Sequence, residues 1–518
     1  MKAAKSRQVR GRVLANRLIL AILILAVLAG LYGLGTIIRP MSVSAAATSA
    51  ATGPRTVRTA LLACPAVASG GQSGNDIAIV NTPAGSSGGQ LVLSRLSPSG
   101  SAAAPAPLSA SPLPGELSIT RVGSARAVAA KRLAMPAMAG GLVPTTLATG
   151  GLTIQAAGRD AQGLDAEQLD PAGLPATGCQ APGSDFWFAG PSAPTMNVLL
   201  YLVNVDSQPA DASVSVQTDS GPSLGTPDSG IVVPPHAMVV QNLSHMLHAA
   251  RAFTLNVTTS AGRVVAAVRE STGPGRQGIW LPVGEAATSQ VLAGLPSGAG
   301  SRELYIAVPG ATAAQVKVTV MTPRGSYQPT GGSDISLLGH LTTGISLPSL
   351  AGIPGAVRVS SNVPVVAVLE AAGGPPGAPG AFAGPSGPLV QQGVLAASPV
   401  GHAGQSDLVL SAPGKAASVR VVQALPGTSL AGLTGQVVRI PAGSSTQVRI
   451  ALPKRARGTL VALVVTPLPG SGPVYAARVA LAGGSVQTIE PVPSAPTSVL
   501  LPPVRQSLVA VLGQSSSG

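Results

Sequence analysis

The chain offers few residues whose types and spacing suit catalysis. Ser223 stands in residues 221–225 (GPSLG), which fit the Gly-x-Ser-x-Gly pattern of a hydrolase nucleophile. Such a serine needs a strand-to-helix turn, followed along the chain by an acid and a histidine. Here the run lies in a Pro/Gly/Ser loop between two β-like segments, and a chain with 64 glycines is expected to match by chance. We therefore predict that Ser223 is not a nucleophile and that the protein is not an enzyme.

Histidines are the next residues that could do chemistry, as metal ligands. His245 and His248 are three residues apart, so on a helix they would share one face. A site would need a third ligand, and neither a His-Glu-x-x-His motif nor a Cys-rich spacing supplies one. His236 follows two prolines in an expected turn. We predict no metal at these histidines.

Asp206, Asp211, Asp219 and Asp228 form an acidic patch of four aspartates within 23 residues. Calcium binds where several oxygens converge on one point. The chain has no Asp-x-Asp-x-Asp-Gly loop, and each of these residues lies in an expected turn, where Asp is favoured anyway. We predict no cofactor, and calcium between β modules remains an open alternative.

One stretch is long and apolar enough to cross a bilayer. It runs from Leu18 to Ile38 without a charge, and a helix of that length covers about 30 Å. Six cationic residues precede it and Arg39 follows, so the positive-inside rule keeps the N-terminus in the cytoplasm and puts the bulk outside. We predict a basic cytoplasmic segment, a transmembrane helix and a tether at residues 1–17, 18–38 and 39–59. In the alternative the segment is a secretory signal, cleaved near Ser44, and the protein is secreted.

The positive charge gathers around this segment. The formal net charge is +14, but nine of the 32 basic residues lie within the first 58 residues, where no carboxylate occurs. Nucleic-acid binding needs a basic face with aromatic side chains for stacking, and aromatics are only 2% of the chain. We therefore predict a membrane rather than a nucleic acid as the partner of the basic segment.

The two cysteines, Cys64 and Cys179, fit an exported chain. Outside the cell a pair of thiols tends to oxidise, and an even count permits one bridge. A Cys64–Cys179 disulfide would close a loop of about 115 residues and stabilise the fold by about 4–5 kcal/mol. Two separate buried thiols are the alternative. The sequence LLAC ending at Cys64 resembles a lipidation box, but 25 residues separate Cys64 from the apolar segment.

Short Val-rich runs between Gly/Pro/Ser/Asn clusters predict β strands almost throughout. Residues 316–320 (VKVTV), for example, alternate apolar and polar side chains. An internal repeat accompanies this pattern. Residues 200–202 (LYL) recur 104 positions later as 304–306 (LYI) and again as 408–410 (LVL), and 188–194 (FAGPSAP) return as 382–388 (FAGPSGP).

The repeat length matches the size of an immunoglobulin-like β sandwich, which has about 100 residues. We predict a mainly β protein in which tandem modules of this type follow the N-terminal helix. Trp187, Trp280 and Phe382 lie near the expected boundaries, where packing between modules would explain them. The alternative is one large irregular β structure such as a propeller. The predicted modules and C-terminal segment are residues 60–185, 186–282, 283–380, 381–485 and 486–518.

The anchor, the two cysteines and residues 184–190 (SDFWFAG) together resemble a known family. Its members are actinobacterial membrane-anchored or secreted proteins, catalogued only as a domain of unknown function. They share an N-terminal apolar segment, a β-rich ectodomain and a Cys shortly before a Phe-Trp-Phe-type motif. The resemblance implies a Gram-positive envelope, often with glycosyltransferase genes nearby, and it implies no catalytic residues.

Two hypotheses for the function follow. The first is a non-enzymatic envelope protein, a membrane-tethered stalk of β modules that binds or scaffolds surface components such as cell-wall polymer. The second is an accessory subunit of an envelope glycan or polysaccharide assembly complex, with contacts through the transmembrane helix. Gly30, Gly33 and Gly35 lie in the outer half of that helix, where small residues allow close approach of other membrane proteins.

Overall fold

The computed structural model describes residue 26 and most of the chain between residues 53 and 500. The described ranges are 53–65, 75–83, 88–98, 107–110, 118–122, 151–170, 174–223, 229–247, 249–271, 278–372, 380–401, 404–425, 433–451 and 460–500. Thr56–Val499 forms one compact unit. Its described residues lie in β strands joined by turns and three short 3₁₀ helices, so the prediction of a mainly β protein is confirmed.

The predicted transmembrane helix, apart from Ala26, lies outside the described residues, as does the chain from residue 501 onward. None of the helices that the structure describes is long and apolar enough to cross a membrane.

The first sheet pair comprises two four-stranded sheets, in the orders β2-β8-β4-β6 and β10-β9-β3-β7. Alternation along β8 turns Leu152, Ile154 and Ala156 inward, where they meet Ile77 and Ile79 of β3 from the opposite sheet. The strands are β2 (Thr59–Cys64), β3 (Asn75–Val80), β4 (Gly89–Arg95), β6 (Pro107–Ala110), β7 (Ser118–Val122), β8 (Leu152–Gly158), β9 (Asp165–Leu169) and β10 (Pro175–Gly178), with the 3₁₀ helix η1 (Arg159–Ala161) after β8.

The second sheet pair has one sheet in the order β11-β17-β13-β14, with β15 also on β13, and another in the order β19-β18-β12-β16-β5. β5 (Ser97–Pro98) comes from the preceding part of the chain and pairs with β16 in parallel. Along β13, Ala212, Val214 and Val216 are buried while Ser215 between them is exposed. The elements are β11 (Asp185–Pro191), β12 (Asn197–Val203), β13 (Ala210–Thr218), β14 (Gly221–Pro222), β15 (Ser229–Val233), β16 (Ala237–Asn242), η2 (Ser244–Met246), β17 (Ala252–Ala261), β18 (Val265–Ser271) and β19 (Ile279–Leu281).

The third sheet group is organised by one strand of 17 residues, β26. Its first part pairs with β20 and β22, and its second part pairs with β21 and β27. Pro364, which has no N–H to donate, lies where the pairing changes. The elements are β20 (Ala287–Leu295), β21 (Arg302–Ala307), β22 (Ala314–Thr322), β23 (Gly325–Tyr327), β24 (Ile335–Leu337), β25 (Thr342–Ser346), η3 (Pro348–Leu350), β26 (Gly355–Ala371) and β27 (Ala381–Ala383).

The fourth sheet pair has the strand orders β28-β33-β30-β31 and β32-β29-β34-β35. The three copies of the sequence repeat, residues 200–202, 304–306 and 408–410, lie in β12, β21 and β29, and each of these strands is flanked by two antiparallel partners. The strands are β28 (Gly393–Pro399), β29 (Gln405–Ala412), β30 (Ala417–Ala424), β31 (Gln436–Ile440), β32 (Ser444–Ile450), β33 (Leu460–Pro467), β34 (Tyr475–Ala482) and β35 (Ser485–Pro491).

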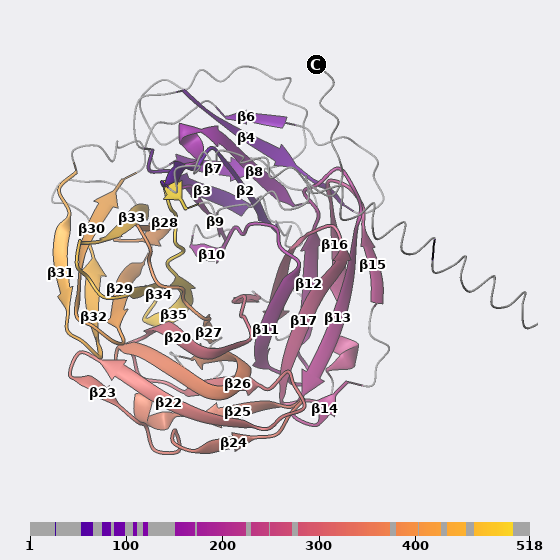
Figure 1. Ribbon diagram of the computed structural model, residues 1–518, viewed down its shortest axis with the longest axis vertical. Helices are drawn as coiled ribbons and strands as arrows, with labels where there is room; N and C mark the ends of the chain where they lie inside the picture. Colours follow the sequence, from indigo (N-terminus) through magenta and orange to yellow (C-terminus); the bar gives the residue numbers. More distant parts are fainter. Residues whose placement is uncertain are drawn as a thin grey trace, which may run out of the picture. The chain divides into compact units, whose positions relative to one another are not determined.

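Figure 1 shows the four groups of sheets following one another around a ring. Hydrophobic clusters join each group to the next, and join the fourth to the first. Tyr201 and Met238 of the second pair pack with Ala63 and Leu96. The clusters between the second and third groups and between the third and fourth are larger. In the last joint, Ala78, Val80 and Leu169 of the first pair pack against the fourth pair through side chains that include Val394 and Leu460.

Backbone pairing adds to this closure. The N–H of Val57, just after β1 (Arg55–Thr56), donates to the carbonyl of Thr497, just before β36 (Ser498–Val499), at 2.9 Å. Thr56–Val499 is therefore a closed cycle of packed sheets. The predicted boundaries between modules stay predictions.

Candidate functional site

The disulfide predicted between Cys64 and Cys179 is present. Cys64 ends β2, and Cys179 directly follows β10 in the opposite sheet of the first pair; their Cα atoms are 4.5 Å apart. Both residues are buried among the side chains of the first core. The bridge thus links two sheets through residues that lie 115 positions apart.

Trp187 and Phe382, two of the aromatics expected near module boundaries, lie where the second and third sheet groups meet. Trp187 is on β11, and its carbonyl accepts a hydrogen bond from the N–H of Gly284 at 2.6 Å. Phe382 is on β27 and is 4% exposed. Both pack with a cluster that also contains Val366 and Val368 of β26.

Trp280, the third of these aromatics, lies on β19 in the second pair. Its ring is 5.3 Å from the ring of Tyr201, and the guanidinium of Arg269 lies 5.9 Å from its centroid. It packs against the cluster that joins the first and second pairs. This environment accounts for Trp280 by packing and a cation–π contact.

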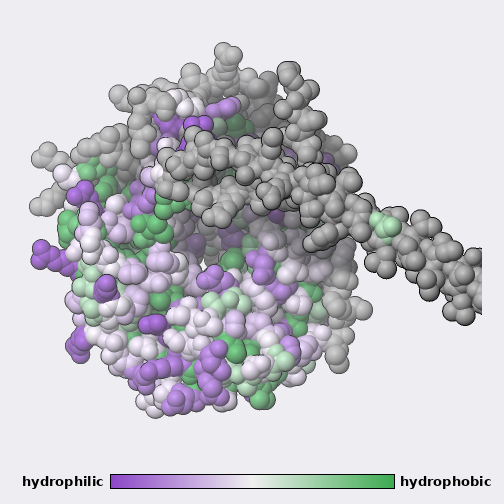
Figure 2. All heavy atoms as spheres, in the orientation of Figure 1, coloured by the Kyte–Doolittle hydropathy of each residue, from purple (hydrophilic) through white to green (hydrophobic). Residues whose placement is uncertain are grey.

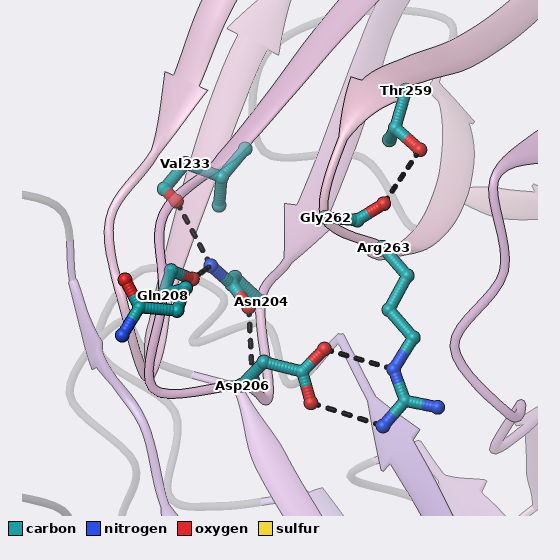
Figure 3. A network of polar contacts seen from close by, with 7 residues as sticks. All are labelled: Asn204, Asp206, Gln208, Val233, Thr259, Gly262 and Arg263. Atoms are coloured by element: carbon teal, nitrogen blue, oxygen red, sulfur yellow. Dashed lines mark hydrogen bonds and ion pairs between the residues drawn. The ribbon is translucent and has the colours of Figure 1, made fainter. Parts of the chain in front are cut away.

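Figure 3 shows the surroundings of Asp206, a residue of the acidic patch. Its two carboxylate oxygens accept hydrogen bonds from Nε and Nη2 of Arg263, at 2.8 and 3.0 Å. Its backbone N–H donates to Oδ1 of Asn204, whose amide nitrogen reaches the carbonyls of Gln208 and Val233. The hydrogen bond from Arg263 holds the pKa of Asp206 below its ordinary value. The hydrogen bonds of Asp206 therefore stabilise the turn in which it lies.

The other acids of the patch are placed separately. Oδ1 of Asp219 accepts the N–H of Arg251 at 3.1 Å, Asp211 lies on β13, and Asp228 lies outside the described residues. Within the ranges that the structure describes, no group of three or more His, Cys, Asp or Glu side chains could hold a metal ion.

Ser223, His236 and His245 occupy separate positions in the second sheet pair. The N–H of Ser223 donates to the carbonyl of Val216 at 2.9 Å, beyond the tight pairing of β14 with β13, so the serine directly follows a β hairpin. Its next five neighbours, residues 224–228, lie outside the described residues. His245 is exposed in η2, His248 is not described, and His236 occupies a turn with a φ of 50°.

The most unusual chemistry lies where the first and fourth sheet pairs meet. We call Asp165, Glu167, Arg478 and Glu490 the closing cluster. Nη1 of Arg478 lies 2.8 Å from both carboxylate oxygens of Glu167 and also donates to the carbonyl of Ala397. Glu490 stands directly opposite Arg478 in the register of β34 and β35.

Backbone groups of β28 complete the cluster. The N–H of Ala396 donates to Oδ2 of Asp165 at 2.8 Å, and the N–H of Ala397 donates to Oε2 of Glu167 at 2.7 Å. Asp165, Glu167 and Arg478 are 5%, 1% and 1% exposed. The cluster thus fastens strands that are more than 200 positions apart in the sequence.

The cluster holds three acids against one guanidinium. Burial, reinforced by the charge of Glu167, raises the pKa of Asp165 well above its ordinary value and that of Glu490 to about 7. Burial also raises the pKa of Glu167, although Arg478 opposes this shift. The arrangement therefore favours protonated acids beside one Glu167–Arg478 ion pair.

A second group of acids, the buried Glu270 and the half-buried Glu370, lies near the joint of the second and third groups. Glu270 of β18 is 2% exposed, and neither of its carboxylate oxygens has a hydrogen-bond partner among the residues that the structure describes. Burial and the charge of Glu370 raise the pKa of Glu270 well above its ordinary value. Glu370 of β26 accepts a hydrogen bond from the hydroxyl of Tyr305 at 2.9 Å.

Sequence reasoning did not find either group of acids. The available signal was the occurrence of charged residues inside apolar strands: Asp165 and Glu167 alternate in β9, and Arg478 interrupts the run of β34 (YAARVALA). Charged residues are almost never fully buried unless paired. The pattern alone indicates burial, but it does not identify the partners.

Comparison with known proteins places the chain in a family. The model of DUF5719 matches residues 134–451, more than half of the chain, from before β8 to just beyond β32. No match to the chain is found among curated proteins. The matched part includes Asp165 and Glu167, whereas Arg478 and Glu490 follow it. The chain therefore belongs to DUF5719, a family of unknown function.

Proposed function

We propose that this protein is a non-enzymatic component of a cell envelope, held by a single N-terminal transmembrane helix with its bulk outside the membrane, where it binds or scaffolds surface components. The observation that carries the proposal is the Cys64–Cys179 disulfide, because such bridges persist in oxidising compartments outside the cytoplasm. The apolar, charge-free residues 18–38 and the basic residues before them support the orientation.

The charged side chains of the closing cluster contact one another, and this structural role supports binding or scaffolding as the function. The acids and guanidinium of the closing cluster face one another across a joint, where they stabilise contacts between sheets. Hydrophilic and hydrophobic residues are interspersed over the visible described surface (Figure 2). Such a surface suits contacts with polar surface components, such as a wall polymer.

The finer architecture belongs to the same proposal. We infer that immunoglobulin-like modules arose by repetition of a unit of about 100 residues. Their closure into one body would present a compact platform above the membrane. An actinobacterial envelope, which the sequence resemblance implies, is the expected setting.

Crosslinking of intact cells tests the proposal. Tagged full-length protein would be crosslinked, purified from membranes and subjected to mass spectrometry, with a matched variant in which an unrelated apolar helix replaces residues 18–38. The proposal expects wall polymer or surface proteins that remain bound to the helix-swapped variant. A membrane glycosyltransferase or transporter that is lost on the swap would overturn it in favour of the accessory-subunit hypothesis.

The topology is tested separately. Protease added to spheroplasts should degrade the β body while sparing a tag at the N-terminus. A protected β body with reduced cysteines would contradict an extracytoplasmic location, and an N-terminus that begins after residue 44 would show a cleaved signal.

A further inference from the structure

The joint between the first and fourth sheet pairs is built differently from the other joints that the structure describes. It combines the apolar contacts of Ala78, Val80 and Leu169 with the closing cluster. The N–H groups of Ala396 and Ala397 on β28 are both bound by carboxylates of β9. These two hydrogen bonds and the Glu167–Arg478 pair cross the joint directly.

Three acids and one cation cannot all be charged in this space without leaving excess negative charge in a poorly solvated region. Glu167 is neutralised by Arg478, so the remaining acids, Asp165 and Glu490, avoid the cost of buried charge by holding protons. When they ionise, repulsion between Asp165, Glu167 and Glu490 acts across the joint, because Asp165 and Glu167 belong to the first pair and Glu490 to the fourth.

The described strands packed around Glu490 place the following charged and polar groups near its carboxyl. β34 contributes Arg478, β9 contributes Glu167 and Asp165, and β10 contributes the N–H of Gly178, which hydrogen-bonds to Glu490. β20 and β27 contain no titratable residue. Glu490 is less enclosed than the other three members, so protons can reach the cluster from solvent at this point.

We propose that the closing cluster is a pH-sensitive latch: the joint between the first and fourth sheet pairs is closed while Glu490 and Asp165 carry protons, and it loosens when they lose them. Opening would let solvent reach both acids, the released protons would pass to water, and reprotonation would reclose the cycle. The latch acts within Thr56–Val499 and does not depend on the proposed envelope role.

The sign of the pH dependence follows from the thermodynamic linkage between proton binding and closure of the joint. A carboxyl whose pKa is raised on closure stabilises the closed form fully below its ordinary pKa, and this contribution is lost as the pH rises to the raised value. For Glu490 the window runs from 4.5 to about 7. If opening returns Glu490 to its ordinary pKa, this residue alone increases the opening equilibrium about 30-fold between about pH 5.5 and about pH 8.5.

Hydrogen exchange measured on the full-length chain tests the latch. Peptides that cover β28 report on the amides of Ala396 and Ala397, and peptides that cover residues 355–359 of β26 serve as the internal reference. Labelling times are scaled to the intrinsic exchange rate at each pH. We expect protection of β28 to fall by about 30-fold or more from low to high pH, while that of the reference changes little.

Three variants separate the latch from general effects of pH. Glu490→Gln should weaken the pH dependence of β28 protection, and Asp165→Asn/Glu490→Gln should remove it. The matched control Glu270→Gln, which changes a buried acid elsewhere, should leave it as in the wild type. Equal protection of β28 at both pH values in the wild type, or an undiminished dependence in Glu490→Gln, would overturn the proposal. The single variant decides the test even if the double variant does not fold.

Discussion

Replacement of Arg478 by methionine gives the sharpest test of the buried charge at the closing joint. Methionine keeps much of the apolar bulk but removes the guanidinium that contacts both oxygens of Glu167. Among the described residues, Glu167 then keeps only the N–H of Ala397 as a hydrogen-bond partner. Because a lone buried carboxylate is strongly unfavourable, Glu167 is expected to take up a proton.

The magnitude follows from the cost of that proton. Keeping a carboxyl neutral above its ordinary pKa of 4.5 costs about 1.4 kcal/mol per pH unit, which is roughly 2 kcal/mol at about pH 6 and roughly 5 kcal/mol at about pH 8. Loss of the bond from Arg478 to the carbonyl of Ala397 adds about 1 kcal/mol. The free energy of unfolding should therefore fall more at the higher pH.

Urea unfolding followed by circular dichroism measures these losses. Arg263→Met is the matched control, because Arg263 contacts Asp206 at 2.8 Å while the two side chains are 49% and 34% exposed, and a solvent-accessible pair contributes about 0–1 kcal/mol. The double variant Glu167→Gln/Arg478→Met should recover most of the unfolding free energy that Arg478→Met loses at high pH, because a glutamine side chain does not titrate. Equal losses for the Arg478 and Arg263 variants, or a double variant no more stable than the single Arg478 variant, would refute the reasoning.

Three further predictions concern other parts of the fold. Cys64→Ala/Cys179→Ala should lower the free energy of unfolding by about 5 kcal/mol, because the bridge restricts a separation of 115 residues in the unfolded chain; a loss below about 1 kcal/mol in urea would contradict this. Glu270→Gln should stabilise the protein increasingly as the pH rises above 4.5, since the wild-type carboxyl has a raised pKa and must hold its proton; melting temperatures that differ equally at low and high pH would argue against it. Gly294→Ala should destabilise by about 1–3 kcal/mol, because φ is +95° and a Cβ would lie 2.5 Å from Ile489; an unchanged melting temperature would show that the contact relaxes freely.

Several features were readable without the tertiary structure because their signals are local. Alternation in runs such as residues 316–320 predicted strands, and β22 (Ala314–Thr322) contains them. The repeated triplets at residues 200–202, 304–306 and 408–410 lie in β12, β21 and β29. Each of these strands pairs antiparallel with a later strand of its own sheet, β16, β25 and β32 respectively. The pairing of Cys64 with Cys179 was predictable because two cysteines permit only one intramolecular bridge.

The closure of the cycle was decided only by the tertiary structure. Nothing in the local pattern of β9 or β34 states that Glu167 will meet Arg478, because the two are 311 positions apart and each strand is compatible with many neighbours. Their meeting depends on how four groups of sheets pack in succession, and small rotations at each joint add up along the chain. The sequence by itself therefore determined the strands, their repetition and the disulfide, whereas packing determined which charged side chains became buried together and hence where protonation can act on the fold.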